Sequence, residues 1–199
     1  MADQRILFFG DSFVGVGDPT AQGWVGRVAQ ASFGHGLPIT TYNLGVRRQT
    51  SPEIAARWLN EANPRLVSGL DCRVVVSFGS NDTTEEAGEL RASPAVSRQA
   101  LVSVLSDAQG RGLRAFVVGP PPVGEVARIQ RTLALADAFA DVCDEWDVPF
   151  VDIMAPLAKS KVWRDEVQRG DGAHPAAGGY TELAAIVLAN GWLDWLRRS

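Results

Sequence analysis

Short apolar runs alternate along this chain with longer segments in which apolar residues recur at helical spacing. The apolar runs are typical of buried strands, and the strongest is Arg73-Val74-Val75-Val76-Ser77-Phe78, which is β-branched and bounded by Gly79. Strands are expected at 5–9, 39–44, 73–78, 115–118 and 149–152. Helices are expected at 23–33, from a Ser51 cap onward, from Ser93-Pro94 to near Gly110, over about 125–146, and from just after Pro175 to about Trp195.

This alternation of strands and helices predicts an α/β fold in which helices cover both faces of a parallel sheet of about five strands. The chain has no internal repeat, low-complexity segment or linker, and its 199 residues suit a single domain over 1–199. In sheets of this kind the ligand lies beyond the carboxyl ends of the strands.

Four of the five expected strands end in glycine-rich or polar sequence. These segments are Gly10-Asp11-Ser12, Asn43-Leu44-Gly45, Gly79-Ser80-Asn81-Asp82 and Gly119-Pro120. Because parallel strands present their carboxyl ends at one edge, we expect these segments to meet there. Any site would lie at that edge.

Charge and composition narrow the class of protein. The net charge is −4 and the pI about 5.2, with no basic stripe, so nucleic acid is not an expected partner. Cys72 and Cys143 are too few for a disulfide framework, and we expect both to be buried as small apolar residues. No signal sequence and no apolar run long enough to span a membrane is visible, which predicts a cytoplasmic protein.

A serine, an aspartate and a histidine are the residue types needed for serine-based acyl transfer. Ser12 follows the first strand, and Asp171 stands three residues before His174, close enough to orient its ring. The only other histidine is His35, expected to lie at a helix end away from the strand ends. The alternatives are that Ser12 caps a helix and that Asp171 and His174 form an ordinary surface turn.

Two further residues could supply hydrogen bonds to an oxyanion: the side-chain amide of Asn81 and the backbone N–H of Gly45. Both are also common turn formers. The sequence contains no G-x-S-x-G elbow, no phosphate loop and no cluster with zinc spacing. We therefore expect neither a cofactor nor a metal.

Taken in order, Gly10-Asp11-Ser12, Gly45 after Asn43, Gly79-x-Asn81-Asp82 and Asp171-x-x-His174-Pro175 resemble the motif blocks of the SGNH hydrolases, also called the GDSL esterase/lipase family. The resemblance implies a flavodoxin-like, three-layer α/β/α sandwich. It implies Ser12 as nucleophile, His174 as base and Asp171 as its partner, with an oxyanion hole formed by Ser12, Gly45 and Asn81. Phe13 departs from the leucine of the family motif.

The expected activity is hydrolysis of a small-molecule ester through an acyl-enzyme, with short-acyl esters of carbohydrates or small metabolites favoured. Short acyl groups are favoured because the sequence shows no long apolar lid and because a stiff segment, Gly119-Pro120-Pro121-Pro122, is expected next to the site. A thioesterase or lysophospholipase-type acyl hydrolase is the alternative within the class, and a non-catalytic module that binds small anions is the alternative outside it. Arg47 and Arg48 could meet an acidic substrate, but solvated surface is the favoured interpretation. The oligomeric state is not readable.

Overall fold

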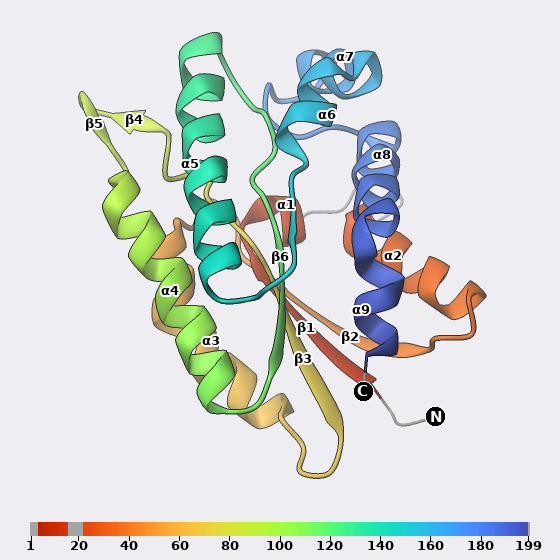
Figure 1. The fold of residues 1–199 in the computed structure, drawn as a ribbon. Coiled ribbons are helices and arrows are strands. Elements are labelled where there is room, and N and C mark those ends of the chain that lie inside the picture. Colours follow the sequence, from red (N-terminus) through yellow and green to blue (C-terminus); the bar gives the residue numbers. More distant parts are fainter. Residues whose placement is uncertain (1–3, 16–21, 199) are drawn as a thin grey trace.

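A computed structural model describes residues 4–15 and 22–198 of the chain. At its centre is a five-stranded parallel sheet in the order β2-β1-β3-β6-β7 (Figure 1). The strands are β1 (Gln4–Gly10), β2 (Ile39–Gly45), β3 (Asp71–Ser77), β6 (Arg114–Val118) and β7 (Phe150–Val151). This order is that of flavodoxin-like sheets, as predicted.

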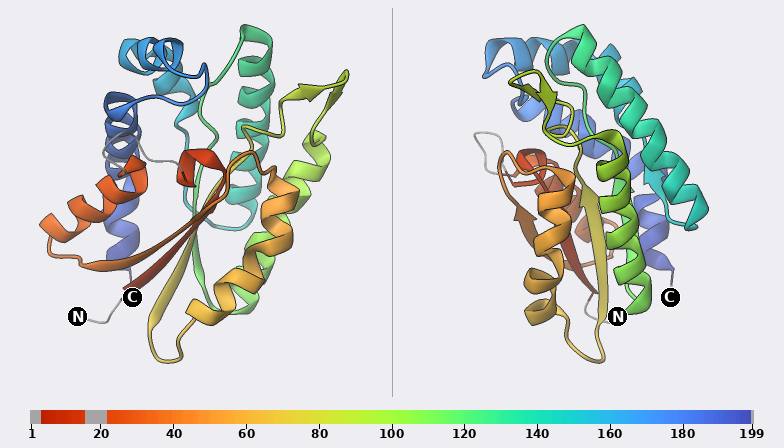
Figure 2. Two further views of the ribbon diagram at one scale, coloured as in Figure 1. Left: turned by 180° about the vertical axis from the view of Figure 1, so that it is seen from behind. Right: turned by 90° about the vertical axis from the view of Figure 1, so that its left-hand side faces the viewer.

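Helices cover both faces of the sheet, which gives the predicted three layers (Figure 2). On one face lie α3 (Ser51–Ala62), α4 (Pro94–Gly110) and α5 (Val126–Glu145), and η1 (Asn63–Arg65) follows α3. On the other lie α2 (Gly23–Gly34), α6 (Met154–Lys159), α7 (Lys161–Arg169), α8 (Ala177–Val187) and α9 (Leu193–Arg197).

The two cores follow from the alternation of side chains along the buried strands. In β1, Ile6 and Phe8 pack with α2, α8 and α9, whereas Leu7 and Phe9 pack with α3, α4 and α5. All four side chains are at most 1% exposed. The predicted burial of the cysteines is confirmed, since Cys72 and Cys143 are buried free thiols.

Three details of the helix prediction need correction. The cap of α3 is Thr50, not Ser51: the Thr50 N–H donates to the Glu53 carboxylate at 2.7 Å and completes a capping box. The last helix is not continuous, because α8 passes through a π-turn, η2 (Leu188–Trp192), where Gly191 has a φ of 91°, before α9 begins. Finally, α6 and α7 were not predicted.

A small antiparallel hairpin, β4 (Glu85–Glu86) and β5 (Glu89–Leu90), was also not predicted. It leaves the chain between β3 and α4 and stands beside the upper end of α5, above the carboxyl edge of the sheet (Figure 1). Its two strands are too short for an apolar alternation to be recognised in the sequence.

Candidate active site

The carboxyl ends of the three neighbouring strands β2, β1 and β3 are level with one another. Gly10 at the end of β1 is opposite Gly45 on one side and Ser77 on the other. The chain reverses its direction of winding between β1 and β3, and such a switch point is where open α/β sheets bind ligands. The polar segments that follow these strands therefore meet at one edge, as predicted.

Ser12 begins α1 (Ser12–Gly15), a single helical turn directly after β1. Its hydroxyl Oγ lies 2.7 Å from Nε2 of His174, and Nδ1 of the same ring lies 2.7 Å from Oδ2 of Asp171. With Nδ1 protonated, the ring donates a hydrogen bond to Asp171 and accepts one from the Ser12 hydroxyl at Nε2. The structure thus aligns the three residues in one hydrogen-bonded chain. His35 ends α2 just before β2 begins, at the opposite edge of the sheet.

The Asp171 carboxylate is fixed by the loop that it belongs to. Its Oδ1 accepts the backbone N–H groups of Ala173 and His174, at 3.0 and 2.8 Å. Partial desolvation acts to raise the pKa of Asp171, but these bonds and the His174 ring outweigh it and hold the pKa at about 2. Asp171 is therefore an anion throughout the neutral range and can support an imidazolium.

A residue that the sequence did not single out, Glu166 of α7, holds the loop from the other side. Its carboxylate accepts the N–H groups of Ala176, Gly178 and Gly179 at 3.0, 3.1 and 2.7 Å. These are the first amides of α8, which have no partner within the helix. Glu166 therefore fixes the start of α8 immediately after His174.

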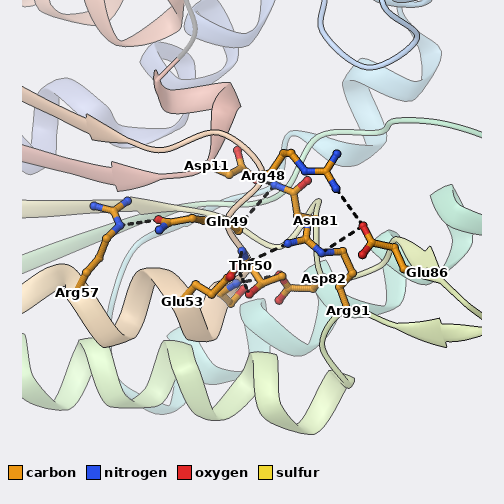
Figure 3. A network of polar contacts seen from close by, with 11 residues as sticks. Asp11, Arg48, Gln49, Thr50, Glu53, Arg57, Asn81, Asp82, Glu86 and Arg91 are labelled. Atoms are coloured by element: carbon orange, nitrogen blue, oxygen red, sulfur yellow. Dashed lines mark hydrogen bonds and ion pairs between the residues drawn. The ribbon is translucent and has the colours of Figure 1, made fainter.

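Asp11, the residue before Ser12, lies beside Asn81 (Figure 3). Asp11 is 1% exposed; its Oδ1 accepts the Phe13 N–H at 2.9 Å and its Oδ2 accepts from Nδ2 of Asn81 at 3.4 Å. The same Asn81 nitrogen donates to the carbonyl of Gln49 at 3.0 Å. The amide of Asn81 is thus held between the loop after β2 and the residue next to Ser12.

Burial raises the pKa of Asp11 to about 7, and the charge of Asp82 acts in the same direction, against the Phe13 N–H and Arg128. Asp82 is itself 1% exposed, and its Oδ1 accepts the Ser51 N–H at 2.8 Å. Two carboxyl groups are therefore enclosed beneath the site.

A model of the GDSL-like lipase/acylhydrolase family matches residues 8–181. The chain belongs to this family. Family membership indicates a hydrolase of ester bonds with a small-molecule ester substrate. It therefore argues against the alternative of a non-catalytic module that binds small anions. A search of curated proteins found no matching relative.

Solved structures share the fold. The acetylxylan esterase from Geobacillus stearothermophilus is 18% identical with a TM-score of 0.81, covering 100% of this chain and 98% of that one. The lipase/acylhydrolase from Enterococcus faecalis is 20% identical with a TM-score of 0.76, covering 94% and 95%. An alpha/beta hydrolase from the metagenome of Lake Arreo, Spain, is 17% identical with a TM-score of 0.75, covering 100% and 99%.

In this GDSL hydrolase, the backbone of β2 at Gly45 lies very close to the backbone of α1. A Cβ atom on Gly45 would lie 2.1 Å from the Gly15 nitrogen and 2.7 Å from the Asp11 carbonyl oxygen. The Gly45 N–H, which the sequence suggested as a donor to an oxyanion, donates to Oδ1 of Asn43 at 3.2 Å in this structure. Gly45 lets α1 lie against β2.

Arg48, three residues later, was treated as solvated surface in the sequence. It has a φ of 65°, a left-handed backbone that a bulky side chain rarely adopts. Its backbone N–H donates to no other residue in the described ranges 4–15 and 22–198. Because the next residue, Gln49, accepts the Asn81 amide, this N–H lies in the loop beside Asn81.

Phe13, the departure from the family motif, packs against the imidazole ring of His174. Its centroid lies 4.8 Å from that of His174 and 6.2 Å from that of Trp163, on which it is stacked. Trp163 in turn donates its indole N–H to the Pro122 carbonyl at 3.0 Å. The larger residue thus fills space between the imidazole and the helix layer.

The described part of the chain holds no group of three or more histidine, cysteine, aspartate or glutamate side chains arranged to bind a metal ion. Over the same residues, none of the helices has both the length and the apolar character of a membrane span.

Proposed function

We propose that this protein hydrolyses short-acyl, acetyl-type esters of carbohydrates or small metabolites through an acyl-enzyme. The observation that carries the proposal is the continuous chain from Ser12 Oγ through His174 to Asp171, with both links at 2.7 Å. Such a chain is the arrangement that makes a serine hydroxyl nucleophilic.

In the first half of the reaction, Nε2 of His174 takes the hydroxyl proton as Ser12 Oγ attacks the acyl carbonyl. Asp171 stabilises the imidazolium that forms. The imidazolium then protonates the leaving alcohol oxygen as its bond to the acyl carbon breaks. In the second half, water attacks the acyl-enzyme, His174 accepts a proton from the water and returns it to Ser12, and the acid is released.

The geometry around Ser12 supports the Ser12 N–H and the Asn81 amide as two of the oxyanion donors. The Ser12 N–H is one of the first amides of α1, which have no partner within the helix. The Asn81 amide donates its two hydrogens to the Gln49 carbonyl at 3.0 Å and to Asp11 at 3.4 Å, and on this proposal an oxyanion would replace Asp11 in the longer of the two bonds. For the third donor we propose the N–H of Arg48 in place of that of Gly45. The Arg48 N–H has no partner among the described residues, whereas the Gly45 N–H is engaged by Asn43.

The acyl preference is supported by the rim next to the site. β6 ends at Val118, and the proline-rich segment that follows is buried and stiff. The fold is also shared with an acetylxylan esterase. The competing substrates are thioesters and lysophospholipids.

The first experiment is covalent labelling of the protein with a fluorophosphonate, followed by mass spectrometry of the peptide that carries Ser12. We expect labelling of wild type and of Ser103→Ala, a control at an exposed serine on α4, and none of Ser12→Ala. With p-nitrophenyl acetate, Ser12→Ala and His174→Ala should each lose about 10⁴-fold or more in kcat. Rates near wild type in either variant would end the proposal.

A substrate panel decides the finer assignment. Acetyl, butyryl and octanoyl p-nitrophenyl esters, the matching thioesters, acetylated xylo-oligosaccharides and a lysophospholipid are compared by kcat/KM. We expect the acetyl oxygen esters to be turned over best. A preference for the octanoyl ester or for lysophospholipid would refute the short-acyl assignment and leave the acyl-enzyme mechanism intact.

A further inference from the structure

Arg48 combines three properties: a strained backbone, a place at the edge of the site, and an ion pair that is easily exchanged. We propose that its guanidinium is a specificity determinant that binds a carboxylate group carried by the ester substrate. The inference rests on the proposed function, because it concerns the substrate of the same site.

The backbone of Arg48 is the first observation. In the described ranges three non-glycine residues have a positive φ: Arg48, Ala87 and Asp147. Ala87 lies in the β4–β5 turn and Asp147 follows the end of α5, both ordinary turn positions. At Arg48 the left-handed backbone carries a long charged side chain where glycine would fit without strain. Strain that persists beside a reaction centre points to a use for the side chain.

The second observation is the position of the Arg48 backbone, which lies in the loop beside Asn81. The carbonyl of the next residue, Gln49, accepts the Asn81 amide at 3.0 Å, and Asn81 also reaches Asp11, the neighbour of Ser12. The Arg48 backbone therefore lies against the residues that surround the nucleophile. Figure 3 shows its side chain leaving this point toward the β4–β5 hairpin. The proposal requires a substrate that extends from Ser12 along this loop to the guanidinium.

The third observation is the partner of Arg48. Its Nη2 lies 3.1 Å from Oε1 of Glu86, and that same oxygen lies 3.6 Å from Nε of Arg91 (Figure 3). Glu86 would thus keep a cation if Arg48 turned to another anion. The neighbouring Glu85 is already paired with Arg131 at 3.1 Å.

Because the Arg48 and Glu86 side chains are exposed to solvent, replacing Glu86 by a substrate carboxylate as the partner of Arg48 costs little free energy. The Arg48 side chain is 76% exposed and that of Glu86 53%, so their pair contributes little to stability. The Arg91 side chain is only 17% exposed and also approaches Glu53 at 3.7 Å, so it remains with the protein. Arg48 is therefore the cation of this group that a substrate can recruit. A carboxylate matches a guanidinium through two parallel hydrogen bonds.

The test uses matched ester pairs that differ only in charge. 4-Acetoxybenzoate and its methyl ester place the carboxylate on the leaving group, and p-nitrophenyl hemisuccinate and its methyl ester place it on the acyl group. The readout is the ratio of kcat/KM for the anionic ester to that for its neutral partner, so any change common to both esters cancels.

We expect wild type to favour the anionic member of at least one pair and Arg48→Gly to lower that ratio about five- to tenfold. Arg47→Gly removes the same charge one residue away and should leave the ratio within about twofold. Arg48→Lys should retain part of the preference, and 0.5 M NaCl should weaken it in wild type. Glu86→Gln should raise the ratio by freeing Arg48. Thermal unfolding checks that Arg48→Gly is folded.

An unchanged ratio in Arg48→Gly, or an equal fall in Arg47→Gly, would overturn the inference while the neutral esters are still hydrolysed. Absence of ester turnover and of Ser12 labelling in wild type would instead refute the proposed function. The two failures are therefore distinguishable.

Discussion

Asp11 should make the protein less stable as the pH rises, and Asp11→Asn should remove this effect. Folding raises the pKa of this carboxyl from 3.8 to about 7, so the folded state binds its proton more tightly than the unfolded chain. Between these values the unfolded chain ionises first, and stability falls with rising pH. Each pH unit is worth about 1.36 kcal/mol, which gives a total of roughly 4 kcal/mol.

Most of this loss falls in an accessible range. Roughly 3 kcal/mol of the difference should appear between pH 5 and pH 8. Urea unfolding of wild type and Asp11→Asn at four pH values measures it. The free energy of unfolding of the variant, minus that of wild type, should become more positive across this range. If the free energies of unfolding of wild type and Asp11→Asn change with pH in parallel, Asp11 has an ordinary pKa, and the prediction that burial raises it is refuted.

The same variant tests the positioning of Asn81. An amide at position 11 can still accept from the Phe13 N–H, but its NH₂ group would then face the Asn81 amide, which is also a donor. We expect kcat for p-nitrophenyl acetate to fall although the fold is more stable at pH 8. Full activity would show that Asn81 does not depend on this contact.

Three further predictions concern the site and its support. Asp171→Asn should lower kcat by about 10²–10⁴-fold with little change in stability, because the amide no longer fixes the tautomer of His174, and a steady-state assay with circular dichroism checks it. Gly45→Ala should destabilise the protein by about 3 kcal/mol in urea unfolding, because the added Cβ would lie 2.1 Å from a backbone nitrogen of α1. The control Gly110→Ala should not destabilise it, because a Cβ at Gly110 would have no neighbouring atom within 4 Å. Phe13→Leu should cost about 1 kcal/mol through loss of its ring contacts, and an unchanged unfolding midpoint would contradict this.

The sheet and the meeting of its polar ends could be predicted because each depends on local sequence. Apolar runs that end in glycine define parallel strands, and parallel strands bring Ser12 and Asn81 to the same edge. The three-residue spacing of Asp171 and His174 is short enough to predict their contact. These inferences need only the period of a strand and the length of a turn.

What could not be predicted depends on residues that are distant in the sequence. Glu166 carries no signal in its own segment, since its partners are amides at the start of α8. The left-handed backbone of Arg48 is hidden because arginine is not a residue that marks such a turn. The role of the Gly45 N–H as an oxyanion donor stays a prediction, but the close approach of α1, which requires a glycine there, could not be seen in the sequence.

The bond between Ser12 and His174 joins residues 162 positions apart, so the order of synthesis separates them in time. At roughly 5–20 residues per second, a ribosome adds the histidine about 8–32 s after the serine. During that interval Ser12 is an ordinary alcohol, because no base is present to accept its proton. On the proposed mechanism, hydrolytic activity therefore has to wait for His174, which follows all five strands of the central sheet in the chain.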